Sequence, residues 1–292
     1  MSNIKNIKNK TNAEEGKKDN KEEYKEPTKA EDMSSFTIFG NIALVNFPDD
    51  FKLKEKKKFA KQILNENRQI KTVVEKSRKF KGRLRKMKTR HLAGEKNKEV
   101  KYKENACVFR FNIDDTYFSP RLSNERKEIA SEIKKGETVL VMFAGVAPYS
   151  IVIAKNTECK KVVSNEINRK ANKYAKLNVE LNNVKDKVKL IQGDIKRLVR
   201  QGKFGKEKFD VIVMPRPNLD DTFLKEAFKL SKKGTRIYYY GFTPVDEKDK
   251  VIEGIKLEAK KAKKRIRIFN KKEAGEIAPY KVRFRVDFRV LS

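Results

Sequence analysis

The chain has 292 residues, of which 38% are hydrophobic, so it can form one large domain or two modest domains with a buried core. A wholly disordered protein is therefore excluded. Lysine and arginine number 72 against 40 aspartate and glutamate residues, which gives a net charge of +32 at pH 7. Such an excess favours a polyanionic partner, because each phosphate that a cation neutralises releases condensed counterions. The alternative is a surface on which lysine simply replaces other solvated residues.

Membrane, metal and hydrolytic functions are disfavoured. No apolar run approaches the roughly 20 residues that a membrane-spanning helix needs, and the lysine-rich start lacks the apolar stretch of a signal peptide. We expect a soluble, cytoplasmic protein without a membrane partner. Cys107 and Cys159 lack the spacing of a zinc site or a disulfide framework, so no structural metal is expected. The single histidine, His91, disfavours hydrolytic chemistry.

Residues 1–33 contain almost nothing that can be buried, which predicts a disordered charged tail over residues 1–35. Eight lysines in this segment balance eight acidic residues. The whole positive excess therefore falls on the folded part, which favours the polyanion interpretation over a basic arm.

A small α+β domain is predicted next, over residues 36–115. The evidence is a β-rich apolar run, a helical pattern and three shorter strand patterns. In chain order these elements are predicted at residues 37–47 (strand), 51–64 (helix), and 70–74, 100–105 and 107–113 (strands).

Residues 76–90 contain nine basic residues and no acid. Within this segment Phe80, Gly82 and Leu84 alternate with cations, the period of two that is expected of a strand with one buried face. The cations of this predicted strand are Lys79, Lys81, Arg83 and Arg85. We interpret them as contacts to RNA; a solvated edge strand made basic to prevent aggregation is the alternative.

A repeated β-α alternation is the main feature of residues 116–292. Short apolar strands separated by helical patterns predict an α/β domain with a mostly parallel, doubly wound sheet. These strands are predicted at residues 138–143, 161–166, 187–194, 209–215 and 235–242. Two further strands, in RIRIF and KVRFRVDFRVL, are expected to be antiparallel at the sheet edge.

Ligands bind at the carboxyl ends of the strands in such a sheet. Gly145, after the first strand, lets the backbone approach a ligand, and Glu166 lies where a carboxylate accepts both hydroxyls of a ribose. Asp194 ends the third strand and can accept from an adenine amino group, although a helix cap is as well supported. The loop lacks the glycine fingerprint and pyrophosphate site of a nicotinamide dinucleotide, which favours S-adenosylmethionine.

Several segments in this order carry a resemblance to a known family. They are FGNIALVNFP, RHLAGE, YFSPRLSNER, MFAGVAPYSI, LNNV, the GD pair and IYYYGF. From about residue 39 onward the chain resembles the archaeal and eukaryotic tRNA (guanine-37-N1)-methyltransferases. The resemblance implies a Rossmann-like class I methyltransferase domain behind a small α+β domain, with tRNA as partner and no metal. It also implies S-adenosylmethionine contacts at Phe143, Ala144, Gly145, Val146, Glu166 and Asp194.

The resemblance further implies a catalytic pair, Arg85 and Glu125, and the chemistry of guanine agrees with it. Guanine N1 carries a proton at neutral pH, so a base must remove it as the methyl group arrives; Glu125 can act so. Charge then accumulates on O6, where the guanidinium of Arg85 can stabilise it. The alternatives are a strand cation for Arg85 and a helix-surface partner of Arg121 for Glu125.

Further cations and one amide are predicted to bind the substrate. Arg121 and Arg126 are assigned to the target nucleotide or to the orientation of their helix. Arg216 and Asn218 are assigned to the guanine, and Lys79, Lys81 and Arg83 to RNA.

Three differences from the family pattern are present. Val141 replaces an acid at the end of the first strand, Ala147 replaces a second glycine, and Pro215 stands where the family has a target-contacting asparagine. The family's usual N-terminal domain is also expected to be missing.

The predicted function is methyl transfer from S-adenosylmethionine to guanine N1 beside the tRNA anticodon, by a monomeric enzyme. One alternative is the related wyosine-pathway transferase, which moves the aminocarboxypropyl arm of the same cofactor. The other is a noncatalytic RNA-binding descendant.

Overall fold

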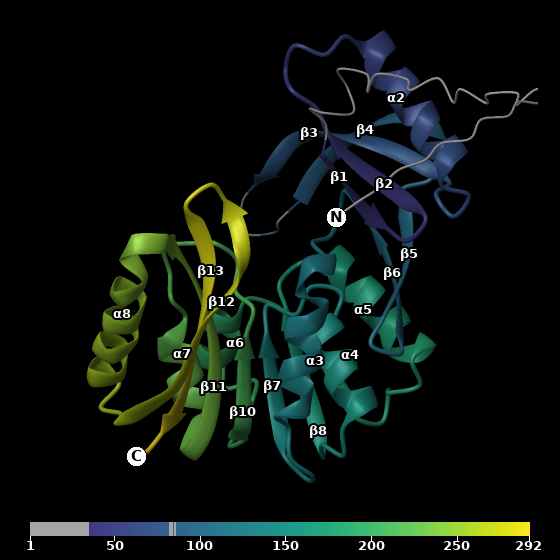
Figure 1. Cartoon of the computed structure of the whole chain (residues 1–292). Coiled ribbons are helices and arrows are strands. Elements are labelled where there is room, and N and C mark those ends of the chain that lie inside the picture. The colour runs from purple at the N-terminus through teal and green to yellow at the C-terminus, as the bar shows by residue number, and fades with distance from the viewer. Residues whose placement is uncertain (1–34, 82–83, 85) are drawn as a thin grey trace, which may run out of the picture.

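The computed structural model describes residues 35–81, Leu84 and residues 86–292. The predicted tail before Ser35, together with Arg83 and Arg85, lies outside these residues, as do the side chains of Lys79 and Lys81. In Figure 1 a small N-terminal unit lies above a larger α/β unit. No helix of the described part is long and apolar enough to cross a membrane.

The small unit is a four-stranded sheet in the order β1-β2-β3-β4, with one helix packed against it. Strands β2 and β3 are parallel because α2 crosses between them, and the other pairs are antiparallel. A separate apolar core includes Val45, Phe59 and Val73. The elements are β1 (Ser35–Phe39), β2 (Ile42–Asn46), α2 (Leu53–Glu66), β3 (Thr72–Lys81) and β4 (Lys86–Gly94).

Two predictions for this unit were wrong in detail. The apolar run at residues 37–47 is two strands, because the backbone turns at Gly40 with φ of +55°. The predicted cationic strand is contradicted at Leu84, which is in a turn and is 41% exposed; β3 ends at Lys81, β4 begins at Lys86, and residues 82, 83 and 85 lie outside the described ones. The alternation of residue types runs on through the turn of a hairpin, so a period of two cannot reveal where the strand ends.

A two-stranded hairpin, β5 (Glu99–Glu104) and β6 (Cys107–Asn112), connects the two units. Two buried asparagines hold this hairpin: Asn178 in α5 (Arg169–Leu181) and Asn182, the C-terminal cap of that helix. Asn178 Oδ1 accepts from the backbone N–H of Arg110 at 2.7 Å, and Asn182 Oδ1 accepts from that of Val108 at 2.9 Å. On the other side, Asn41 Oδ1 accepts from the N–H of Lys101 at 2.8 Å. Asparagine side chains thus satisfy backbone groups of β5 and β6 that neighbouring strands would satisfy in a larger sheet.

The large unit is a seven-stranded sheet in the order β12-β13-β11-β10-β7-β8-β9. Strands β7 to β11 are parallel, which confirms the predicted doubly wound fold, and β13 is antiparallel to both of its neighbours. The two C-terminal strands are the antiparallel pair at one end of the sheet, as predicted; β12 is the edge strand and β13 lies between β12 and β11. The strands are β7 (Thr138–Met142), β8 (Lys161–Glu166), β9 (Val188–Gln192), β10 (Phe209–Met214), β11 (Ser231–Pro244), β12 (Ile266–Ala278) and β13 (Lys281–Val290).

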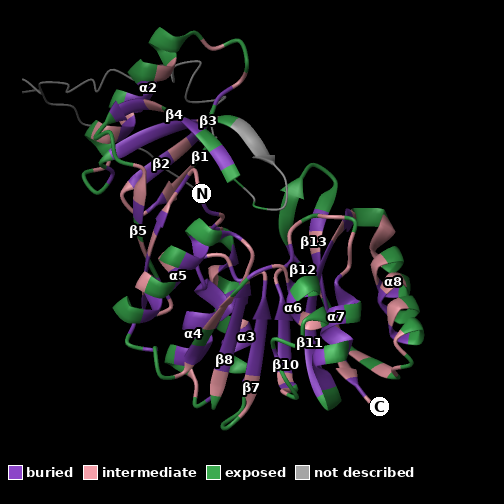
Figure 2. Ribbon diagram, turned by 180° about the vertical axis from the view of Figure 1, so that it is seen from behind, coloured by how far each residue is buried: buried purple, intermediate pink, exposed green. Residues whose placement is uncertain are grey.

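Helices cover both faces of this sheet. Along β7, Val139 and Val141 belong to one apolar core, whereas Leu140 and Met142 belong to the other. The strand is therefore buried on both sides, as Figure 2 shows in purple for the middle of the sheet. The helices are η1 (Pro120–Leu122), α3 (Ser123–Ser131), α4 (Pro148–Asn156), α5, α6 (Ile195–Arg200), α7 (Leu224–Leu230), η2 (Val245–Glu247) and α8 (Lys248–Lys261).

Removing the charge of Glu104 should destabilise the fold strongly. Arg126 is 1% exposed, and its Nη2 donates to Glu104 Oε2 at 2.5 Å. In Glu104→Gln the guanidinium loses its counter-ion in a buried place, which is expected to cost about 3–5 kcal/mol. Urea unfolding measures this loss. Glu158→Gln is the control, because it breaks an exposed pair with Lys135 and should change stability by less than about 1 kcal/mol. Equal effects of the two changes would contradict the prediction.

Candidate functional site

A cavity opens at the carboxyl edge of the sheet, where β7, β8, β10 and β11 end. It encloses about 920 Å³ of empty space, including part of its open mouth. Leu84 of the small unit also lines it, so the wall is built from both units. The other lining residues are Tyr117, Phe118, Ser119, Leu122, Arg126, Phe143, Ala144, Gly145, Pro148, Tyr149, Glu166, Ile167, Asn168, Ala171, Pro215, Arg216, Pro217, Asn218, Tyr240, Phe242 and Arg283.

The loop after β7 brings its backbone against this cavity. Gly145 has φ of +59°, and a Cβ there would lie 3.3 Å from the carbonyl oxygen of Tyr117, so glycine suits the position for two reasons. Phe143 and Ala147 also have positive φ, of 60° and 67°. Glycine adopts this left-handed backbone at Ala147 without the steric cost that a Cβ brings, which is the physical reason for a glycine at this position. The side chain of Ala147 is fully buried.

Glu166 bonds to this loop with one carboxylate oxygen and to the start of α5 with the other. Oε2 accepts from the backbone N–H of Gly145 at 2.7 Å, and Oε1 accepts from that of Asn168 at 2.7 Å. Burial raises the pKa of the Glu166 carboxyl, and the N–H groups of Asn168, Gly145 and Ile167 oppose that rise. Each oxygen keeps lone pairs that can accept from a ligand hydroxyl.

The residues around Glu166 fit a nucleoside that carries no phosphate. Glu166 can receive a diol, and Ile167, Pro148 and Ala171 supply apolar contact beside it. The charged side chains of the lining come from other parts of the wall, and one of them, Arg126, is already paired. The cavity thus agrees with the predicted cofactor class. Among the described residues, no group of three His, Cys, Asp or Glu side chains could hold a metal ion.

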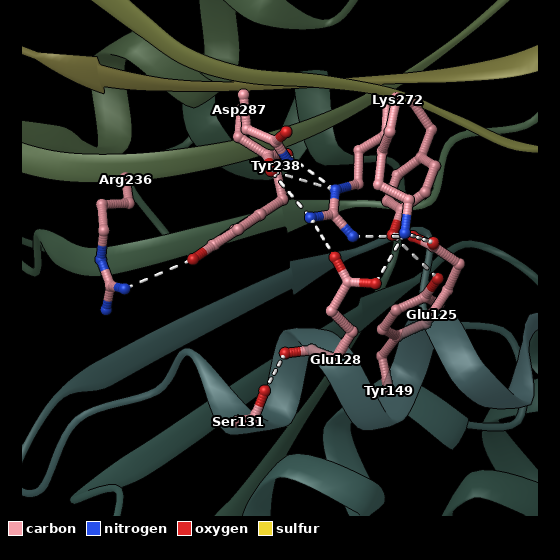
Figure 3. Close-up of polar contacts among 11 residues, drawn as sticks. Glu125, Glu128, Ser131, Tyr149, Arg236, Tyr238, Lys272 and Asp287 are labelled. Carbon is pink, nitrogen blue, oxygen red and sulfur yellow. Dashed lines mark hydrogen bonds and ion pairs between the residues drawn. The ribbon is translucent and has the colours of Figure 1, made fainter.

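Glu125, the predicted base, lies on α3 behind the wall and is 7% exposed. Its Oε2 accepts from Tyr240 Oη at 2.9 Å and from Arg285 Nη1 at 2.8 Å. Its Oε1 lies 2.7 Å from Lys272 Nζ. Figure 3 shows these contacts converging between α3 and the C-terminal strands. Glu125 itself does not line the cavity, whereas Tyr240 does.

Arg126 and Arg121 have different surroundings. Arg126 lines the cavity, yet its guanidinium pairs with Glu104 and donates to the carbonyl of Ser119 at 3.0 Å. It also lies 5.0 Å from the ring centre of Phe118. The geometry supports the second of its predicted roles, orientation of the helix. Arg121 is exposed and outside the cavity lining.

The loop after β10 lines the cavity through Pro215, Arg216, Pro217 and Asn218. Arg216 is 7% exposed, and its Nη2 donates to the carbonyls of Leu219 and Asp221. Within the described part of the chain its Nε has no hydrogen-bond partner. A buried donor without a partner is costly, so this nitrogen is suited to a ligand acceptor.

Two predicted cofactor contacts do not line the cavity. Val146 is fully buried in the core next to α4, and Asp194 caps α6. Asp194 Oδ1 accepts from the backbone N–H groups of Lys196 at 2.8 Å and Arg197 at 3.3 Å. The geometry therefore matches the capping alternative for Asp194. Arg83, Arg85 and the side chains of Lys79 and Lys81 lie outside the described residues, although Leu84 between the two arginines lines the cavity.

Sequence reasoning missed Tyr240, Arg285 and Asn168. Asn168 donates to the carbonyl of Leu84 at 3.3 Å and to that of Asp115 at 2.8 Å, so it joins the small unit to the cavity. One signal was available for Arg285 and Asp287, since two opposite charges alternate with apolar residues in a strand that is otherwise buried. Only the tertiary structure shows that they meet Glu125.

The chain is similar to known proteins in both of its units. The family model described as the TRM5/TYW2 methyltransferase domain matches residues 100–268, and that described as the TYW2 N-terminal domain matches residues 21–97. The second match falls mostly on the predicted small α+β domain, residues 36–115.

Named relatives agree with these matches. The tRNA (guanine(37)-N(1))-methyltransferase Trm5b of Pyrococcus abyssi is 33% identical over 88% of this chain and 75% of its own length, and its crystal structure superposes with a TM-score of 0.78. The Nanoarchaeum equitans enzyme Taw22, a tRNA (guanine(37)-N(1))/4-demethylwyosine(37)-methyltransferase, is 31% identical over 88% of this chain and its own full length. A complex of an enzyme named aTrm5 with tRNALeu has a TM-score of 0.78 at 27% identity, over 88% of this chain and 72% of that one.

Asp194→Ala should destabilise the protein by about 1 kcal/mol, because the first turn of α6 loses its acceptor. Asp194→Asn should be nearly neutral, since the amide oxygen can accept the same bonds. Thermal or urea unfolding of the two variants measures the difference. If the alanine and asparagine variants are equally stable, capping is not the role of this residue.

Proposed function

This chain belongs to the TRM5/TYW2 methyltransferase family, and we propose that it transfers a methyl group from S-adenosylmethionine to N1 of guanine 37 in tRNA. The observation that carries the proposal is the cavity itself. A loop anchored by Glu166 lies on one side of it, and the Glu125 cluster lies behind Tyr240 on another. Leu84 of the cationic segment closes a third side. Cytoplasmic location and a monomeric state stay predictions.

The cofactor side is assigned to residues that fit it. Glu166 accepts the two ribose hydroxyls, while Gly145 permits close approach of the backbone. When bound, S-adenosylmethionine supplies an electrophilic methyl group. The apolar residues Phe143, Pro148 and Ile167 exclude water from the neighbouring space. Asp194 and Val146 are not needed for this assignment.

The target side must remove a proton and stabilise an anion. Guanine N1 becomes a nucleophile only as its proton leaves, and the acceptor we assign is the Glu125 carboxylate. We assign Arg216 to the target base, because its buried Nε has no partner in the described chain and can donate to an acceptor of that base. It would take the role of the family's asparagine, whose position Pro215 occupies. Arg85 remains the predicted partner of guanine O6, and Leu84 beside it lines the cavity.

A second candidate is methylation of 4-demethylwyosine at position 37. The Taw22 relative, which this chain matches over its full length, carries both activities in its name. Pro215, in place of the asparagine, alters the surface that meets the target base. Aminocarboxypropyl transfer and a noncatalytic role in RNA binding are the remaining alternatives.

One experiment separates these functions. The enzyme is incubated with S-adenosylmethionine labelled either in the methyl or in the carboxyl carbon. The substrates are tRNA transcripts with guanine or adenine at position 37, and tRNA carrying 4-demethylwyosine. Methyl label that enters only the guanine transcript, at N1, is the expected result. Carboxyl label in tRNA would overturn methyl transfer, and no label with intact tRNA binding would favour the noncatalytic alternative.

Glu125→Gln should lower kcat about 10²- to 10⁴-fold, because the amide cannot accept the proton from guanine. Single-turnover methylation at saturating tRNA measures the change. Glu128→Gln is the matched control. Glu128 lies on the same helix and pairs with the same Arg285 and Lys272, but within the described part of the chain it makes no hydrogen bond with Tyr240. Loss of activity in both variants to the same extent would argue for a structural role of the whole cluster.

As the pH is lowered, cofactor affinity should begin to fall at a higher pH than it would if Glu166 were an exposed glutamate. The pKa of Glu166 is raised by burial, and only its ionised form has both oxygens available as acceptors. Below that pKa the affinity should drop by up to about tenfold per pH unit. Calorimetry of cofactor binding over a pH series measures the slope. Glu166→Gln should bind more weakly at neutral pH and show a flat profile; a wild-type profile that is equally flat would contradict the assignment.

A further inference from the structure

The cavity is separated from the base Glu125 by one hydroxyl group. Tyr240 lines the cavity, and Glu125 does not. The side chain of Glu125 is 9% exposed, and both of its oxygens already have donors within the protein: Tyr240 and Arg285 on one, Lys272 on the other. A proton that leaves a base in the cavity therefore meets Tyr240 before it reaches the carboxylate.

The hydrogen-bond directions around Tyr240 suit such a transfer. An ionised carboxylate can only accept, so Tyr240 must donate its hydroxyl proton to Glu125 Oε2, 2.9 Å away. Tyr149 Oη in turn donates to Tyr240 Oη at 3.2 Å. A hydroxyl oxygen has two lone pairs, and Tyr149 takes one of them. Among the described residues no donor occupies the second lone pair, and Tyr240 itself lines the cavity.

The cluster behind Tyr240 has one negative charge in excess. Three carboxylates, those of Glu125, Glu128 and Asp287, surround two cations, Arg285 and Lys272. Asp287 is 1% exposed and Arg285 is 2% exposed, whereas the side chains of Lys272 and Glu128 are 33% and 40% exposed, so solvent screens only the outer part of the cluster. Uptake of one proton makes the cluster neutral. Glu125 lies at the buried end and bonds to Tyr240, so it is the member that a proton from the cavity can reach through that hydroxyl.

We propose that Tyr240 relays the proton of the target base to Glu125, an inference that rests on the proposed function. The bond between guanine N1 and its hydrogen breaks as that proton passes to Tyr240 Oη, and the Oη proton passes to Glu125 Oε2. The electron pair left on N1 forms the new bond to the methyl carbon, and the bond from that carbon to sulfur breaks with its pair on sulfur. Tyr240 ends as it began, and the carboxylate holds the proton.

Tyr240→Phe tests the relay, because it removes the hydroxyl and keeps the ring. We expect kcat to fall about 10²-fold, with tRNA affinity measured without cofactor unchanged. The residual rate should rise about tenfold per pH unit above neutrality, since guanine must then lose its proton to solvent. Tyr238→Phe is the matched control. It lies two residues earlier on β11 and loses a buried hydroxyl that accepts from Arg236 and, among the described residues, has no bond to Glu125, so its kcat and its pH profile should match wild type.

A proton inventory on the unmodified enzyme keeps the proposal testable if the phenylalanine variant does not fold. Single-turnover rates are measured in mixtures of H₂O and D₂O. Two protons in flight predict a curved dependence on the deuterium fraction, and direct transfer to Glu125 predicts a straight line. A straight line, or wild-type kcat in a folded Tyr240→Phe, overturns the relay while methyl transfer stands. Absence of methyl transfer by the wild-type enzyme overturns the proposed function and the relay with it.

Discussion

The buried guanidinium of Arg285 connects α3 to the C-terminal strand β13 beside the cavity. It contacts Glu125 and Glu128 on α3 and Asp287 on its own strand, each at 2.8 Å. Alone, any of these charges would be costly to bury, so the group is stable only when all its members are in place. Because β13 lies inside the sheet, between β12 and β11, the last strand of the chain determines where the residues of α3 sit.

The same cluster of charged residues has two roles, one structural and one catalytic. Its ion pairs hold α3 against the sheet, and its excess of one carboxylate makes it a sink for a proton. The first task needs every bond to be satisfied, and the second needs one group that can change its protonation state. Tyr240 connects both tasks to the cavity, since it lines the cavity and its hydroxyl donates to Glu125.

The small unit also contributes to the site rather than only standing beside it. Asn168 bonds to the carbonyls of Leu84 and Asp115, and Asn178 and Asn182 hold the β5–β6 hairpin by its backbone. These amides at the two ends and inside α5 therefore fix the hairpin, Leu84 and Asp115 to the large unit. A buried amide can do this because it offers a donor and an acceptor at once and carries no charge that would need a partner.

The order of elements and the fold class were readable from the sequence by itself. Apolar strands with helical segments between them leave few alternatives to a parallel sheet, and Gly145 and Glu166 follow their strands at positions where a ligand is expected. The turn at Leu84 was hidden, because alternation of charged and apolar residues continues through it. Asp194 was ambiguous in the sequence, since the same carboxylate can cap a helix or meet a ligand. Tertiary structure alone decided that Glu125 lies behind Tyr240 and pairs with Arg285, because both residues are more than a hundred positions from Glu125 and charge pairing between strand and helix leaves no local pattern.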